Sequence, residues 1–175
     1  MNPYTQCPVF ETQNFFLRLV SEADAEDLLV CYSDPKAQKF FNIDGFPHNC
    51  NFNTAREMLK CIKFWLMEYS HEAYVRFAIV DKAIGKAIGT IEMFGGKTGI
   101  LRLDIASKYE NKSHLAEILD MCVKNFYELF KVNCIATKAA SQAATRIEVL
   151  SEAGFKPGDF NGIEDYYLRQ AKPIL

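Results

Sequence analysis

The sequence has no excess of basic residues and no long apolar run. Its 20 Lys and Arg residues stand against 22 Asp and Glu residues, which gives a formal net charge of -2. Proteins that bind nucleic acid usually present a basic face, and anionic membranes attract clusters of Lys and Arg, so we expect neither partner. No stretch approaches the roughly 18 apolar residues that suggest a membrane-spanning helix.

A secretory signal and metal-binding spacings are also missing. Residues 1–10 lack a basic stretch followed by an apolar core, which favours a cytoplasmic location. No two of the six cysteines have CxxC spacing and the three histidines are far apart, so we expect no metal site. Cys61 and Cys122 fall within apolar helical stripes, and we interpret the cysteines as reduced thiols.

The hydrophobic periodicity predicts alternating strands and helices in one domain, residues 1–175. A length of 175 residues and a hydrophobic content of 49% suit one globular domain. Period-two patterns predict strands at 15–20, 75–80, 87–94, 100–107 and 134–139, and a final pair of short strands after Phe155. Three- and four-residue spacings predict helices from Ser21 to Asp34-Pro35, from 53 or 54 to about 69, and over 112–130 and 142–153. The aromatic-rich segment 36–52 is predicted to be a loop.

This order of elements predicts an α/β (α+β) fold with a mixed sheet. Consecutive strands joined by short glycine-containing turns favour antiparallel hairpins. The strand–helix–strand unit between Ile100 and Ala139 favours one parallel pair. We therefore predict a seven-stranded, mostly antiparallel sheet with helices on both faces, in which the fourth and fifth strands are parallel and splayed.

Several phrases in the right order resemble the GNAT family of acyl-CoA-dependent N-acetyltransferases. They resemble most closely the branch that acetylates N-termini of ribosomal proteins. The phrases are Glu11-Thr12, Leu17-Arg18, Asp24, Asp34-Pro35, Ile84-Gly85, Ile88-Gly89-Thr90-Ile91, Tyr109 to Leu119, Val149-Leu150 and Gly154-Phe155. The resemblance implies acetyl-CoA as a co-substrate and no metal.

In that family the loop after the fourth strand carries R/Q-x-x-G-x-G/A and binds the pyrophosphate of coenzyme A at a helix N-terminus, where free N–H groups favour an anion. The six motif positions here are Glu110, Asn111, Lys112, Ser113, His114 and Leu115. Glu110 brings a negative charge, Ser113 replaces a glycine and Leu115 replaces a small residue. Lys112 is the favourable cation. The resemblance also implies that Ile105 and Ser107 offer backbone hydrogen bonds to the pantetheine arm.

Acetyl transfer to an amine needs a base to remove a proton from the acceptor. Glu92, near the end of the third strand, is our first candidate and Asp104 on the fourth strand is the second, although Arg102 is placed to pair with either carboxylate across the strands. Tyr166 is a candidate acid. Many members of the family have a tyrosine as acid where this chain has Leu150, which we interpret as core packing.

The resemblance implies transfer of an acetyl group by direct attack of a primary amine, either a protein N-terminus or a small molecule. The departures in the loop favour an alternative, a catalytically degenerate GNAT-fold module that binds or regulates. The asparagine and the serine or alanine that many members carry at the start of the fourth helix are here Ala143 and Arg146. The sequence leaves open whether the protein is a monomer or a homodimer.

Overall fold

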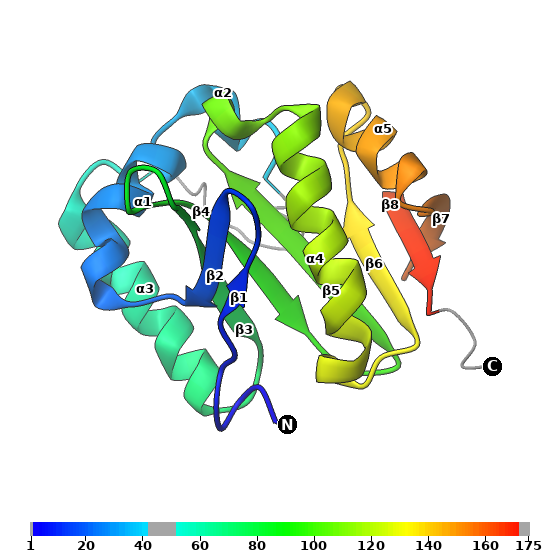
Figure 1. The fold of residues 1–175 in the computed structure, drawn as a ribbon, viewed down its shortest axis with the longest axis horizontal. Helices are drawn as coiled ribbons and strands as arrows, with labels where there is room; N and C mark the ends of the chain where they lie inside the picture. The colour runs from blue at the N-terminus through cyan, green and yellow to red at the C-terminus, as the bar shows by residue number, and fades with distance from the viewer. Residues whose placement is uncertain (1, 42–51, 172–175) are drawn as a thin grey trace.

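The computed structural model describes residues 2–41 and 52–171. In these residues one eight-stranded sheet runs in the order β1-β2-β3-β4-β5-β6-β8-β7 (Figure 1). The strands are β1 (Phe10–Glu11), β2 (Phe15–Leu19), β3 (Val75–Asp81), β4 (Lys86–Phe94), β5 (Thr98–Ile105), β6 (Cys134–Lys138), β7 (Lys156–Phe160) and β8 (Ile163–Gln170). All neighbouring strands are antiparallel except β5 and β6.

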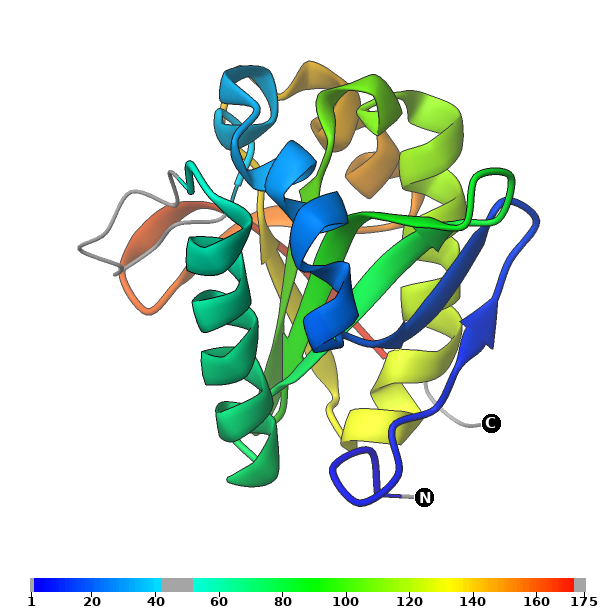
Figure 2. The same cartoon turned by 90° about the vertical axis from the view of Figure 1, so that its left-hand side faces the viewer.

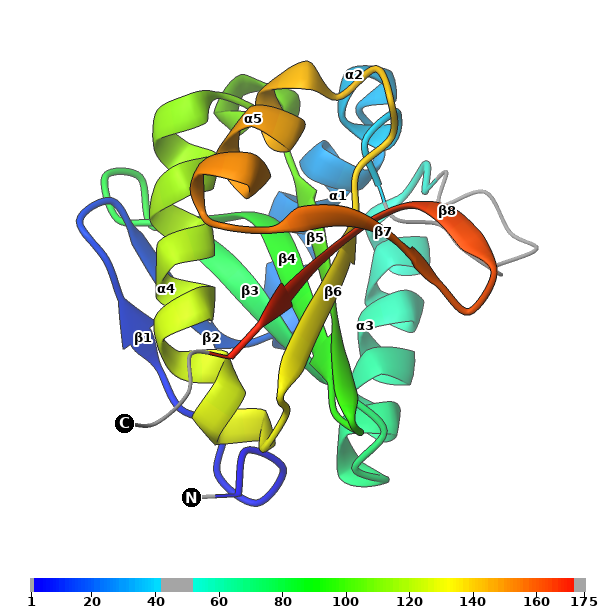
Figure 3. The same ribbon diagram turned by 90° about the vertical axis from the view of Figure 1, so that its right-hand side faces the viewer.

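Helices cover both faces of this sheet. They are α1 (Ala25–Tyr32), α2 (Pro35–Gln38), α3 (Ala55–Ser70), α4 (Lys112–Phe130) and α5 (Ala144–Glu152), with short 3₁₀ turns η1 (Glu22–Asp24) and η2 (Ser107–Tyr109). The α1 and α3 helices lie on one face, and α4 lies on the other with α5 packed beside it (Figures 2 and 3). The described residues include no helix with the length and apolar character needed to cross a membrane.

The helices begin where the sequence places capping residues. Thr54 and Glu57 form a capping box at the start of α3, and Asn111 caps α4 by accepting a hydrogen bond from the backbone N–H of His114 at 3.1 Å. Gly154, with φ +85°, follows α5 at the position where a left-handed residue ends a helix. The predicted helix over 112–130 is confirmed with the same bounds.

The parallel pair separates part-way along its length. Thr98 to Leu101 of β5 pair with Cys134 to Thr137 of β6, whereas β5 continues to Ile105 without β6 beside it. On its other side β6 pairs with β8 along its whole length, up to Lys138 opposite Tyr166. The predicted splayed pair is therefore confirmed, and within the described residues no strand lies beside the part of β5 from Leu103 to Ile105 on the β6 side.

Two expectations need correction. The sheet has eight strands rather than seven because Phe10–Glu11 pairs with Phe16 and Leu17 of β2, and two residues are too few to give a period-two pattern. The segment expected to be a loop from residue 36 opens with α2, because Asp34 accepts a hydrogen bond from the N–H of Lys36 and Pro35 occupies the first helical turn. Residues 42–51 of the expected loop lie outside the described residues.

Candidate active site

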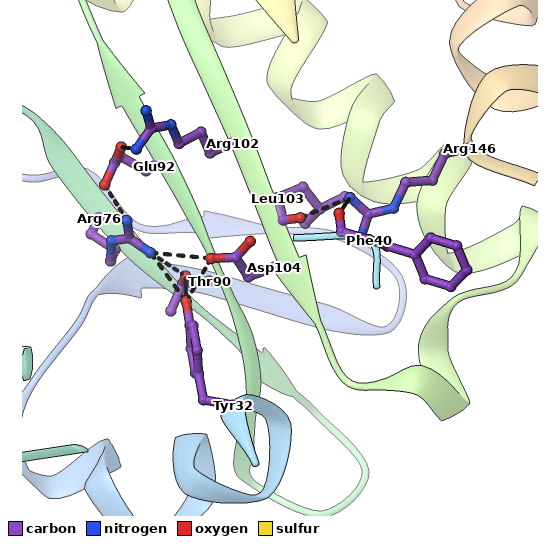
Figure 4. Close-up of polar contacts among 9 residues, drawn as sticks. All are labelled: Tyr32, Phe40, Arg76, Thr90, Glu92, Arg102, Leu103, Asp104 and Arg146. Atoms are coloured by element: carbon purple, nitrogen blue, oxygen red, sulfur yellow. Dashed lines mark hydrogen bonds and ion pairs between the residues drawn. The ribbon is translucent and has the colours of Figure 1, made fainter. Parts of the chain in front are cut away.

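Five polar side chains from three adjacent strands lie on the sheet face that α1 and α3 cover. The register places Arg76, Glu92 and Arg102 side by side on β3, β4 and β5, and Thr90 beside Asp104 one pleat away. Alternate residues of a strand point to the same face, so all five converge (Figure 4). The exposed fraction is 7% for Arg76, 3% for Glu92 and 8% for Asp104. This burial requires that the charges satisfy one another.

Glu92 is held between two arginines. Arg76 forms an ion pair with it from one side, and Nη1 of Arg102 lies 3.3 Å from Oε1 on the other. The expected cross-strand pairing of Arg102 is thus confirmed for Glu92. Each of the two carboxylate oxygens of Glu92 therefore already has a guanidinium partner. An acceptor amine would have to compete with these arginines for Glu92, our first candidate base.

Asp104 has a different environment. Its Oδ2 accepts a 2.8 Å hydrogen bond from the hydroxyl of Tyr32 on α1 and lies 3.4 Å from Nη1 of Arg76. Its Oδ1 is buried and accepts no hydrogen bond from the described residues. Burial raises the pKa of this carboxyl above its ordinary value, and Arg76 and Tyr32 act in the opposite direction. Asp104 therefore has both a free oxygen and an increased proton affinity.

Arg146 forms a second polar cluster where β5 leaves β6. Its Nε and Nη2 lie 2.5 and 2.9 Å from the two carboxylate oxygens of Glu110. Its Nη1 donates at 2.9 Å to the backbone carbonyls of both Leu103 and Phe40 (Figure 4). Only 5% of Arg146 is exposed. One side chain of α5 thus connects β5, the loop before α4 and the end of the α2 segment.

An apolar cavity of about 40 Å³ lies beside Arg146. Leu103 of β5, Leu115 of α4 and Leu150 of α5 contribute to its walls. Leu150 is buried and lines this space, which agrees with a packing role. The cavity marks the opening between β5 and β6, and Arg146 forms part of its wall.

Two other residues expected to contact the cofactor already have partners within the protein, Ser107 and Lys112. Ile105 is fully buried and lies opposite Gly89 of β4, and the N–H of Ser107 lies 3.3 Å from Oδ2 of Asp34. Lys112 lies 2.8 Å from Glu148 and 2.6 Å from Glu152 of α5.

Of the remaining positions of the loop, Asn111, His114 and Leu115 contact other residues of the protein. Nδ2 of Asn111 lies 2.8 Å from Nδ1 of His114, whose ring packs against Phe15 and Tyr109. Leu115 is 2% exposed and belongs to the core. Ser113 is an exposed residue in the first turn of α4. Lys112 and Ser113 are therefore both exposed to solvent at the start of this helix.

Tyr166 lies apart from the carboxylates. It belongs to β8, two strands away from β5 in the sheet order, and its ring packs 5.2 Å from that of Phe160. Within residues 2–41 and 52–171, no group of three or more His, Cys, Asp or Glu side chains is arranged to hold a metal ion.

Sequence reasoning did not identify Tyr32 or Arg76 as members of the site and gave no role to Arg146. The signal for Arg76 was an arginine between Val75 and Phe77 in a strand with apolar neighbours on both sides. A buried arginine needs an acidic partner, and Glu92 and Asp104 were the acids on adjacent strands.

Comparison with known protein families identifies the family of this chain. Residues 14–156 match the family described as the acetyltransferase (GNAT) domain. The chain belongs to the GNAT acetyltransferase family. A comparison with curated protein sequences gives no match.

Solved structures of GNAT proteins share the fold. Ribosomal-protein-S5-alanine acetyltransferase from Vibrio fischeri is 16% identical with a TM-score of 0.74, covering 95% of this chain and 100% of that one. The ribosomal L7/L12 α-N-protein acetyltransferase RimL, in complex with coenzyme A, is 11% identical with a TM-score of 0.74 and coverages of 93% and 98%. RimJ from Mycobacterium smegmatis, in complex with coenzyme A disulfide, is 15% identical with a TM-score of 0.75 and coverages of 96% and 88%.

The GNAT fold implies coenzyme A, but the described side chains do not fit this ligand as they stand. The Leu103 carbonyl, which the exposed edge of β5 would offer to an amide, accepts from Arg146 instead. The Ser107 N–H is directed at Asp34, and the carboxylate of Glu110 stands two residues before α4, where a pyrophosphate would bring more negative charge. Binding of coenzyme A therefore requires that these side chains move.

Proposed function

We propose that this GNAT protein catalyses acetyl transfer from acetyl-CoA to a primary amine, either a protein N-terminus or a small molecule. The proposal rests mainly on Asp104. Its carboxylate lies on the part of β5 that has left β6, is buried, and keeps one oxygen without a hydrogen-bond donor among the described residues. An ammonium group supplies both the positive charge and the donors that this oxygen lacks.

Asp104 would act on the acceptor. An ammonium group that donates to Oδ1 would transfer a proton to the carboxylate and become a neutral amine, the form that attacks a thioester. Tyr32 and Arg76 hold Oδ2, which would leave Oδ1 for the acceptor. The raised pKa of Asp104 assists this transfer because a base with higher proton affinity removes the proton more readily.

The names of two structural relatives support a choice of acceptor to test. The RimL and Vibrio fischeri structures are described as acetyltransferases of ribosomal proteins. We therefore propose a peptide N-terminus as the first acceptor to test and small amines as the second.

The test is an acetylation assay with acetyl-CoA and a panel of N-terminal peptides and small amines, read by mass spectrometry of the acceptor. Asp104→Asn should lower the rate by about 10²- to 10⁴-fold, the usual contribution of a positioned base. Asp120→Asn is the matched control, because Asp120 is an exposed acid on α4 that pairs with Lys124. Full activity of Asp104→Asn would remove Asp104 from the mechanism.

Arg146 favours a second candidate, a module that keeps the fold and has lost catalysis. Its contacts with Glu110 and Leu103 fill the place that a cofactor arm would need. This candidate predicts that no amine is acetylated by the natural sequence at any concentration of acetyl-CoA. Acetylation of one amine, lost on mutation of Asp104, would exclude it.

A further inference from the structure

Arg146 makes polar contacts with several separate chain segments around the opening between β5 and β6. Its three nitrogens contact three separate segments: Glu110 before α4, Leu103 on β5 and Phe40 after α2. The side chains of Arg146 and Glu110 are only 6% and 9% exposed. The pair is therefore a buried connection across the opening rather than a surface ion pair.

The carbonyl of Leu103 shows what Arg146 replaces. Leu103 lies opposite Ile91 of β4, and its carbonyl points away from β4 toward the side that β6 has left. A backbone carbonyl at such an edge needs a donor from another strand, a ligand or a side chain. The guanidinium of Arg146 supplies that donor from within the protein.

Glu110 and Lys112, at the start of α4, are also paired with charged side chains of the protein. Glu110 is fixed by Arg146 just before α4, and Lys112 in the first turn is turned toward Glu148 and Glu152. Helix N-termini favour anions, but here the cations Arg146 and Lys112 are already paired with carboxylates of the protein. A phosphate-bearing ligand has to compete with these carboxylates.

We propose that Arg146 and Glu110 form a latch that occupies the coenzyme A cleft from inside, so that the cofactor binds only after their ion pair breaks. This inference rests on the proposed function in taking coenzyme A as the ligand. When the competent state is a small fraction of the molecules, the apparent affinity falls by that fraction. A cleft that is open in about one molecule in ten would weaken binding about tenfold.

The test compares coenzyme A binding by isothermal titration calorimetry in three variants and the natural sequence. Arg146→Ala breaks the latch but leaves Glu110 buried without a partner, which endangers folding. The double variant Glu110→Gln/Arg146→Ala removes both charges and keeps the test valid if the single variant is unstable. Arg169→Ala is the control, because Arg169 also bonds to a carbonyl, that of Ala153, and does not line the cavity.

We expect the double variant to bind coenzyme A at least about tenfold more tightly than the natural sequence, with Arg169→Ala unchanged. Pantetheine alone, which carries no phosphate, should gain affinity in the same variant because its amides meet the freed Leu103 carbonyl. Equal affinities in the double variant and the natural sequence would overturn the latch.

The latch and the proposed function fail in different ways. Tighter binding in the double variant with no acetylation of any amine would support the latch and reject the acetyltransferase. Acetylation by the natural sequence at unchanged coenzyme A affinity would reject the latch and support the acetyltransferase. No binding to any variant at millimolar coenzyme A would reject both.

Discussion

The guanidinium carbon of Arg76 lies 4.1 Å from the centre of the Trp65 ring, so a cation of β3 rests on an aromatic face of α3. From this position its nitrogens reach Glu92 and Asp104 on the two neighbouring strands. Burial lowers the pKa of Arg76, but Glu92, Tyr32 and Asp104 together raise it, so the side chain stays charged. Arg76 thus contacts both of the carboxylates buried on this face of the sheet, and Arg102 is a second partner for Glu92.

Replacing Arg76 by Met should lower the free energy of unfolding by about 3–5 kcal/mol, because the loss of one partner leaves buried charges uncompensated. Urea unfolding followed by circular dichroism measures the change. Lys124→Met is the control, since the exposed pair of Lys124 with Asp120 should contribute less than about 1 kcal/mol. If Arg76→Met lowers the free energy of unfolding by as little as Lys124→Met does, Arg76 does not neutralise the two carboxylates.

The regular elements could be predicted from sequence, whereas the partners of the buried charges could not. Each predicted helix and strand carried a periodic apolar pattern of its own, so local information sufficed. Arg146, by contrast, contacts Glu110 and Phe40, which lie 36 and 106 residues away along the chain. Only the folded sheet brings them together, and the sequence therefore indicated a weakened cofactor loop without showing what fills it.

A second prediction concerns the close contact of Gly89 on β4 with the backbone of Asp104 and Ile105 on β5. A Cβ at Gly89 would overlap the backbone carbonyl oxygen of Asp104 and lie 2.7 Å from Cα of Ile105. Gly89→Ala should therefore destabilise the protein by about 1–3 kcal/mol or more, since backbone atoms cannot rotate away. Gly95→Ala is the control, because its nearest atom is the Phe130 carbonyl oxygen at 3.3 Å. Thermal unfolding should give a lower melting temperature for Gly89→Ala than for Gly95→Ala. Equal melting temperatures would show that β4 and β5 can move apart at little cost.

A substitution of Lys131, the residue that ends α4, should stabilise the protein. Lys131 ends the helix with φ 54° and ψ 42°, a left-handed conformation that costs a side-chain-bearing residue about 1–2 kcal/mol. Glycine adopts it freely but loses about 0.5–1 kcal/mol of chain entropy on folding. Lys131→Gly should therefore gain roughly 0.5 kcal/mol, measured as a higher urea midpoint, whereas Lys131→Ala keeps the strain and should gain nothing. A loss of stability in Lys131→Gly would show that the Lys side chain matters more than the backbone.

The pKa of Asp104 gives a pH test that does not depend on knowing the acceptor. A carboxyl whose pKa is raised on folding contributes stability below its unfolded pKa of about 3.9, and this contribution is lost as the pH rises through the folded value. The free energy of unfolding of the natural sequence should therefore fall relative to that of Asp104→Asn as the pH rises from about 4.

Asp24 provides a control of opposite sign. Burial raises the pKa of Asp24, but hydrogen bonds from Arg18 and Ser21 outweigh it, and the net pKa is lowered. A carboxyl with a lowered pKa contributes stability above its unfolded pKa and loses it as the pH falls through the folded value. Relative to Asp24→Asn, the natural sequence should therefore gain stability as the pH rises toward about 4. Urea unfolding of both variants across this range measures the two slopes. If Asp104 gives the same slope as Asp24, its pKa is lowered rather than raised, and the case for Asp104 as the proton acceptor loses its electrostatic support.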